Sequence, residues 1–206
     1  VKEPFIELAK SSLNTFLNAM TFPDKTCYPV ASTNEKDLYN LIDVYLDAVF
    51  YPLLAERTLQ QEGWHYELES PQGPLRYQGV VYNEMKGNYS SPDLLIEYEY
   101  SQRCLFPDTI YSLDSGGDPL VIPTLTYAEF KAFHEKYYHP SNAYIWFYGD
   151  DAEEKRLAYL DEWLNAFEAR QVDAEIPLQP RWTSPRRLAY AYDPGDTPQA
   201  KAYITL

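Results

Sequence analysis

Histidine and cysteine, the residues most often used to bind metals or act as nucleophiles, are scarce in this sequence. Only three histidines and two cysteines occur among its 206 residues. Cys27 and Cys104 are isolated and lack any metal-type spacing, so we interpret them as reduced thiols in a cytosol-like compartment. No GxSxG motif and no phosphate-cradling glycine loop is present. These absences argue against serine hydrolases and nucleotide-binding enzymes.

Positive charge and long apolar runs are also lacking. The sequence has 17 basic and 31 acidic residues, a net charge of −14. Nucleic-acid binding needs a basic surface, so we expect no nucleic-acid partner. An acidic surface attracts cationic peptides, although it also simply maintains solubility. No apolar run approaches the length of a transmembrane helix, so we expect no membrane partner. The start shows no targeting segment and no initiating methionine, and we expect a processed or excised piece.

The composition that is present favours a folded α+β protein. The chain is 45% hydrophobic and 16% aromatic, enough to bury a core. Its length suits one large or two small domains. Twenty tyrosines and sixteen prolines indicate strands and ordered loops. Helical and strand patterns mix without a regular βαβ repeat, which is typical of the α+β class.

Hydrophobic periodicity and capping residues predict the elements in outline. Helices are expected over residues 3–13, 37–50 (capped by Thr33 or Asn34), 80–86, 91–104, 126–138 and 153–167. A hairpin is expected over 15–31, and strands over 64–68, 143–148, 187–192 and 200–206.

The histidines offer one tempting motif. The segment from His134 to His139 resembles HExxH, but its histidines are five residues apart instead of four, about 140° apart around a helix. Pro140 ends that helix, so His139 is interpreted as a helix-end residue near the negative end of the dipole. His65 lies between aromatic residues and is interpreted as a packed or surface strand residue. Ser115 is interpreted as a turn residue.

Glu84 is the one candidate metal ligand. It follows the apolar pair Val80-Val81 and is expected in the first turn of a helix. A glutamate there is ordinarily a solvated residue favoured by the dipole. The residue pattern alone leaves both interpretations open.

Longer segments resemble the presequence protease branch of the pitrilysin/insulinase zinc peptidases. The matching segments are residues 2–5, 12–19, 24–32, 39–50, 61–68, 83–87, 114–119 and 137–143. They run in order along nearly the whole chain. The resemblance implies a single partial domain over residues 1–206, with a mostly antiparallel sheet packed against helices. It also implies an endopeptidase that degrades short unstructured peptides, such as cleaved targeting peptides, inside a closed chamber.

The resemblance gives Glu84 a role. In that family an HxxEH motif supplies two histidine ligands and a glutamate general base, and a downstream glutamate matching Glu84 completes a Zn²⁺ site. The fourth zinc position stays open for water, whose pKa the metal lowers for attack on a peptide carbonyl. The HxxEH motif is absent here. The resemblance therefore implies no catalytic residue in this chain, zinc that is poorly retained, and an inactive piece.

A substrate site is implied as well. The family binds peptides by adding them to a sheet edge, and the segment matching that edge comprises Leu17, Asn18, Ala19, Met20 and Thr21. An ordinary hairpin strand is the alternative. The implied partners are unstructured peptides, basic ones included, and the remainder of the polypeptide. Three alternative functions stay open: non-catalytic peptide binding, a chamber wall and a purely structural domain. Two locations also stay open, a bacterial cytoplasm and an organellar matrix or stroma.

Overall fold

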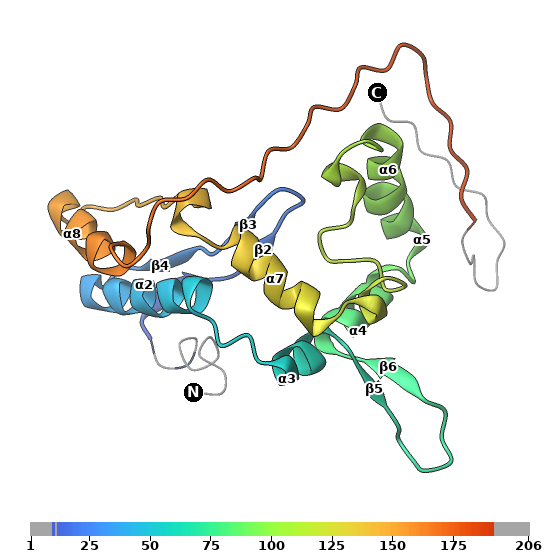
Figure 1. Cartoon of the computed structure of the whole chain (residues 1–206), viewed down its shortest axis with the longest axis horizontal. Coiled ribbons are helices and arrows are strands. Elements are labelled where there is room, and N and C mark those ends of the chain that lie inside the picture. The colour runs from blue at the N-terminus through green and yellow to red at the C-terminus, as the bar shows by residue number, and fades with distance from the viewer. Residues whose placement is uncertain (1–9, 11, 192–206) are drawn as a thin grey trace. The chain divides into compact units, whose positions relative to one another are not determined.

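The structure is a computed structural model that describes residues 10 and 12–191 (Figure 1). Nearly all of the helix expected over 3–13 and all of the strand expected over 200–206 lie outside those residues. The chain divides into two compact units. The first unit takes its described residues from 1–20, 26–53 and 128–174, and the second from 21–25, 54–127 and 175–206. The single domain expected over 1–206 stays a prediction.

The first unit contains the predicted hairpin. Strand β1 (Asn14–Leu17) pairs antiparallel with β4 (Val30–Ser32), and Leu17 lies opposite Val30. The short strands β2 (Met20–Thr21) and β3 (Thr26–Cys27) form a second two-stranded sheet. The expectation of strands over 15–31 is therefore confirmed.

Helix α2 (Glu35–Phe50) packs against β1 and β4. Its N-cap is Asn34, whose Oδ1 accepts a hydrogen bond of 3.0 Å from the backbone N–H of Asp37. Such a cap satisfies a backbone donor that the first turn leaves free. The buried side chains repeat at helical spacing and form one stripe, made of Tyr39, Leu41, Tyr45 and Leu46. A helix packed on antiparallel strands confirms the α+β class.

Two further helices complete the first unit. Helices α7 (Tyr127–Tyr137) and α8 (Glu153–Leu164) match the predictions with slightly shorter ends. Helix α8 is fixed to α2 by a hydrogen bond of 2.8 Å from Trp163 Nε1 to Asp43 Oδ1. The rings of Tyr39 and Tyr159 also meet edge to face, with centroids 4.9 Å apart.

The second unit is mostly helical. One hairpin joins β5 (His65–Glu67) to β6 (Arg76–Gln78), which confirms the strand expected near 64–68. Helix α4 (Val80–Asn88) extends slightly beyond its predicted range. The helix expected over 91–104 is found, but its middle is π-helical. The remaining elements are α3 (Glu56–Thr58), η1 (Leu59–Gly63), α5 (Pro92–Leu94), η2 (Leu95–Tyr100), α6 (Ser101–Leu105), η3 (Ile110–Ser112), η4 (Ile122–Thr124) and, in the first unit, η5 (Pro140–Asn142).

Two strand predictions are wrong within the described residues. Residues 143–148 and 187–191 are extended chain that belongs to no sheet. An apolar run becomes a strand only when another strand pairs with its backbone, and the described chain supplies none here. Trp146 and Tyr148 consequently remain largely exposed.

Candidate metal-ligand helix and neighbouring sites

Helix α4 carries Glu84, and one face of this helix packs in a buried cluster. Tyr82 and Met85 are buried and form a cluster with Ile122, against which Trp64 and Tyr89 pack. The helix starts after Gly79, whose φ of 148° brings the backbone close to the neighbouring chain. A Cβ there would lie 2.2 Å from the carbonyl oxygen of Gly63, so this close approach requires glycine.

Glu84 lies on the opposite face of α4 and is exposed. At 100° per residue it points about 160° away from the buried Tyr82. The expectation that Glu84 sits in the first turn is wrong, because α4 begins at Val80 and its first turn contains no acidic residue. The helix dipole acts mainly over the first turn and does not account for this glutamate.

Exposed apolar side chains lie beside Glu84 on α4. Val80, four residues earlier, is 57% exposed, and Val81 is 37% exposed. Gly87 lies three residues further on, and a Cβ built there would meet nothing within 4 Å among the described atoms. Glu84 therefore stands beside two exposed valines and a glycine that leaves room for close approach by another element.

No complete metal site is present in the described part of the chain. No group of three or more His, Cys, Asp or Glu residues there could hold a metal ion. Glu84 is an oxygen donor of the kind that zinc accepts, but it would need ligands from outside these residues.

The three histidines have structural contacts of their own. His134 Nε2 lies 2.8 Å from the carbonyl oxygen of Val49, and the His134 ring stacks on Tyr138. His139 follows α7, as predicted, and its Nδ1 accepts a hydrogen bond from the N–H of Ser141. Burial, with a smaller contribution from the charge of Arg170, lowers the pKa of His139 below its ordinary value. These contacts support the interpretation that the HExxH-like segment is not a metal site.

The predicted substrate edge is part of the hairpin. Within the described residues, β1 and β4 form a sheet of two strands. Asn18 donates its N–H to the carbonyl of Pro29 at 3.2 Å, and its own carbonyl accepts from the Tyr45 hydroxyl at 3.2 Å. Ala19 donates to Asn18 Oδ1. The two residues that follow, Met20 and Thr21, form β2.

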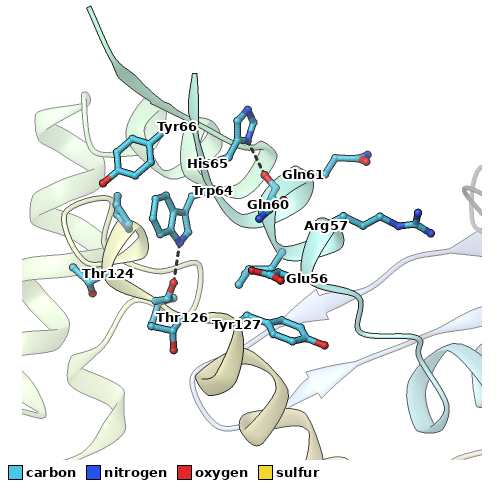
Figure 2. A pocket seen from close by; sticks show the side chains of 13 residues that line it. Glu56, Arg57, Gln60, Gln61, Trp64, His65, Tyr66, Thr124, Thr126 and Tyr127 are labelled. Atoms are coloured by element: carbon cyan, nitrogen blue, oxygen red, sulfur yellow. Dashed lines mark hydrogen bonds between the residues drawn. The ribbon is translucent and has the colours of Figure 1, made fainter. Parts of the chain in front are cut away.

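A cavity that the sequence does not signal lies in the second unit (Figure 2). Its volume is about 910 Å³, and Trp64, Tyr66 and Tyr127 give it an aromatic lining. Trp64 Nε1 donates to the carbonyl of Leu125 at 3.0 Å, and His65 Nδ1 donates to that of Gln60 at 2.6 Å. These bonds fix the wall of the cavity. The remaining lining residues are Glu56, Arg57, Leu59, Gln61, Pro123, Thr124 and Thr126.

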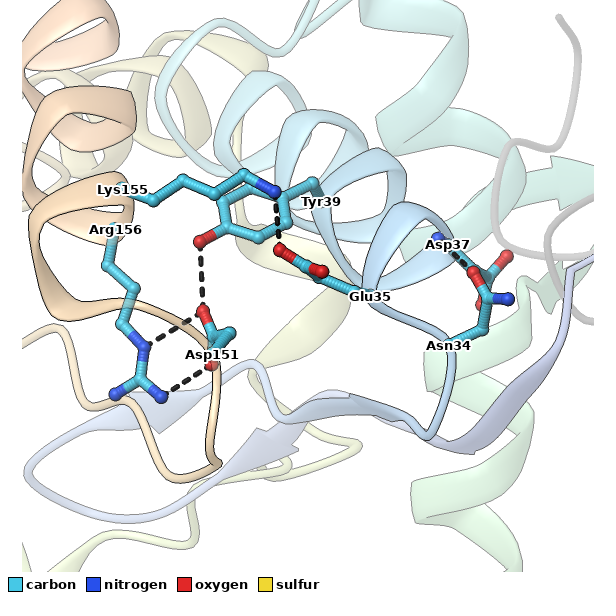
Figure 3. Close-up of polar contacts among 7 residues, drawn as sticks. All are labelled: Asn34, Glu35, Asp37, Tyr39, Asp151, Lys155 and Arg156. Carbon is cyan, nitrogen blue, oxygen red and sulfur yellow. Dashed lines mark hydrogen bonds and ion pairs between the residues drawn. The ribbon is translucent and has the colours of Figure 1, made fainter.

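The first unit contains a half-buried ionic cluster (Figure 3). Arg156 donates two hydrogen bonds to the Asp151 carboxylate, of 2.9 and 2.5 Å, and Tyr39 donates a third of 2.9 Å. The bonds from Arg156 lower the pKa of Asp151 to about 2. Burial, followed by the bond to Asp151, raises the pKa of Tyr39 to about 12. Every charge here is paired, which is typical of a structural cluster.

Comparison with known proteins identifies the class of protein. The family profile described as "Peptidase M16 inactive domain" matches residues 124–206. Together with the α+β fold and the relatives below, this match shows that the chain belongs to the M16, or pitrilysin/insulinase, peptidase family.

Several of the similar proteins are presequence proteases. The chain is 57% identical over 199 residues to presequence protease 1, chloroplastic/mitochondrial, of Arabidopsis thaliana, covering 95% of the chain and 18% of that protein. It is 44% identical to mouse mitochondrial presequence protease (91% of the chain, 18% of that protein) and 56% identical to Protein HypA of Clostridium perfringens (93% and 20%). The chain thus spans about a fifth of the length of these relatives. Among the described residues, no helix is both long and apolar enough to cross a membrane.

Proposed function

We propose that this chain is part of a zinc-dependent endopeptidase that degrades short unstructured peptides, and that Glu84 is its glutamate zinc ligand. The observation that carries the proposal is the position of Glu84 on α4. The helix is fixed by Tyr82 and Met85 on one face, and it presents the carboxylate on the other, uncovered face. The exposed valines beside Glu84 favour packing against a second helix, which a merely solvated glutamate would not require.

The partner of this face would be a helix from the rest of the polypeptide. Gly87 lets a second backbone approach α4 closely, and Val80 and Val81 would bury apolar surface against it. That helix would bring the two histidines and the general base of an HxxEH motif. Zinc in such a site would polarise the peptide carbonyl and lower the pKa of a water molecule. The task of this chain is to hold one carboxylate oxygen at the site.

Substrate binding is proposed along the backbone from Leu17, at the end of β1, to Thr21 in β2. Backbone pairing along an edge suits peptides of many sequences. The acidic net charge of −14 favours peptides with basic residues. The names of the plant and mouse relatives place those proteins in chloroplasts or mitochondria, and a related protein is bacterial. An organellar matrix or stroma and a bacterial cytoplasm both fit.

The test is Glu84→Gln in the complete polypeptide, with Glu97→Gln as the matched control. Glu97 is another exposed glutamate of a helical segment in the same unit. Glu84→Gln should lose bound zinc, and kcat/KM for an unstructured peptide should fall at least about 100-fold. Mutation of residues that only hydrogen-bond to metal ligands already lowers metal affinity or activity about 10–100-fold. Glu97→Gln should keep both. Full zinc content and activity in Glu84→Gln would overturn the ligand assignment.

A second candidate function is a non-catalytic wall or peptide-binding part of the same fold. The description of the matching family profile as an inactive domain favours it, although the match starts at residue 124, beyond Glu84. In that case the complete polypeptide would bind an unstructured basic peptide without cleaving it and would contain no zinc at Glu84. Metal analysis and a cleavage assay on one preparation separate the two functions.

A further inference from the structure

We propose that Arg103 is a positioning residue for the Glu84 carboxylate and that it acts through the loop over residues 114–119. The inference rests on the proposed function of Glu84. Arg103 lies on α6 and does not contact Glu84 in any described interaction. Arg103 contacts the loop over residues 114–119, and this loop in turn contacts α4.

The first link is the contact between the loop and α4. Met85, the neighbour of Glu84, is 5% exposed and its sulfur sits directly over Gly116. A Cβ at Gly116 would lie 2.4 Å from Met85 Sδ, so the space between loop and helix is completely filled. A displacement of the loop at Gly116 would press on the Met85 side chain, which packs beneath the turn that carries Glu84.

The second link is the internal order of the loop. Asp114 accepts the N–H of Gly116 through its side chain and that of Gly117 through its carbonyl. Asp118 accepts the N–H of Leu120 through Oδ1 and that of Ile122 through its carbonyl, which connects the loop to the same cluster as Met85. The loop is thus a rigid turn held by its two aspartates.

The third link fixes the loop to the neighbouring helix. Asp118 Oδ2 lies 3.5 Å from Arg103 Nη2, and the same guanidinium forms an ion pair with Glu99. The Glu99 side chain is only 3% exposed, whereas that of Arg103 is 37% exposed. Glu99 has no other positive side chain paired with it among the described residues. Arg103 therefore both neutralises a buried carboxylate and holds the loop.

Tyr89 connects this cluster directly to α4. It caps the C-terminal end of α4, and its ring packs against the Tyr82–Met85–Ile122 cluster. Burial raises the pKa of the Tyr89 hydroxyl, and the next largest contribution is the charge of Glu99. The end of α4 and the buried carboxylate are therefore neighbours. Without Arg103, an unbalanced negative charge would remain beneath the helix, which favours rearrangement of the loop.

The experiment measures zinc affinity of the complete polypeptide by chelator competition. Arg103→Met should weaken zinc binding about tenfold, the lower end of the range for groups that orient a ligand. Arg103→Lys keeps the charge but not the planar fork and should weaken it about threefold. The matched control is Arg76→Met, which breaks an exposed ion pair with Glu69 in the same unit and should leave zinc affinity unchanged. Urea unfolding of the metal-free variants reports stability separately.

The outcomes separate this inference from the function on which it rests. If Glu84→Gln loses zinc while Arg103→Met binds it as tightly as the parent, the positioning role is overturned and the ligand assignment stands. If Glu84→Gln retains zinc, the ligand assignment itself fails, and the positioning role with it. If Arg103→Met does not fold, Arg103→Lys decides, because unchanged affinity in that folded variant contradicts the proposal.

Discussion

Two ionic clusters, one in each unit, shift the pKa of their carboxylates in opposite directions. In the first unit, Asp151 receives three hydrogen bonds, and pairing with Arg156 outweighs burial, so its pKa falls to about 2. In the second unit, burial outweighs pairing, and the pKa of Glu99 rises above its ordinary value despite Arg103. The first cluster favours the charged form of Asp151, whereas the second disfavours the charged form of Glu99.

The difference suggests different roles for the two clusters. A fully bonded carboxylate contributes stability, because the native state favours its charged form. A desolvated carboxylate with one partly exposed partner contributes little or costs stability. The second cluster neighbours Tyr89, the C-cap of the helix that carries Glu84, and we propose that it contributes more to the position of that helix than to stability.

Removing a partner from each cluster should have the largest effect. Asp151→Ala leaves the buried Tyr39 hydroxyl without its acceptor and Arg156 without its ion-pair partner, so the free energy of unfolding should fall by about 2 kcal/mol. Glu99→Gln removes a costly charge while Arg103 keeps Asp118, and should change it by less than about 1 kcal/mol. Urea denaturation of both variants measures the contrast. Equal losses would show that the clusters are equivalent.

Alanine at two glycines tests the two faces of α4. Gly116→Ala forces Met85 aside and should destabilise the chain by about 2 kcal/mol. Gly87→Ala meets open space within a helix and should stabilise it by about 0.5–1 kcal/mol. Thermal unfolding checks both values. In the complete polypeptide Gly87→Ala should instead lower zinc affinity, if a second helix approaches closely at that point.

The pH dependence should have opposite signs for the two clusters, with the smallest effect. Asp151 has a lowered pKa, so its contribution is present above its usual pKa near 3.8 and is lost as the pH falls toward 2. Glu99 has a raised pKa, so protonation relieves its cost as the pH falls through the folded value toward the usual 4.5.

Urea midpoints between pH 2 and 7 would show this difference through two variants. In Asp151→Asn, the decrease in the free energy of unfolding between pH 7 and pH 2 should be smaller by about 1–2 kcal/mol. Glu99→Gln should remove the smaller gain in stability that protonation of Glu99 gives as the pH falls. The same slope change in both variants would contradict the comparison.

The sequence predicts the helices of this chain better than its strands. The Asn34 cap of α2 is a local signal, and it is found. Residues 143–148 have a strand-like sequence but no partner in the described chain, and pairing is not a local property. The π-helical turns at Leu59–Gly63 and Leu95–Tyr100 have no sequence signature that periodicity detects.

The candidate site was predictable only in part. Resemblance singles out Glu84, but its place on an uncovered helix face required the structure. The four-residue spacing of Glu99 and Arg103 is visible in the sequence, as for any helical ion pair. The burial of Glu99 and the contact of Arg103 with Asp118 depend on the tertiary fold, which no local pattern encodes. The cavity beside Trp64 likewise depends on segments far apart in the chain.

The most direct test of the central claim is a structure of the complete zinc-loaded polypeptide with anomalous scattering measured at the zinc edge. The account predicts one zinc ion with a Glu84 carboxylate oxygen at about 2.0–2.2 Å and two histidines from another helix as further ligands. A zinc ion bound elsewhere, with Glu84 pointing into solvent, would contradict it.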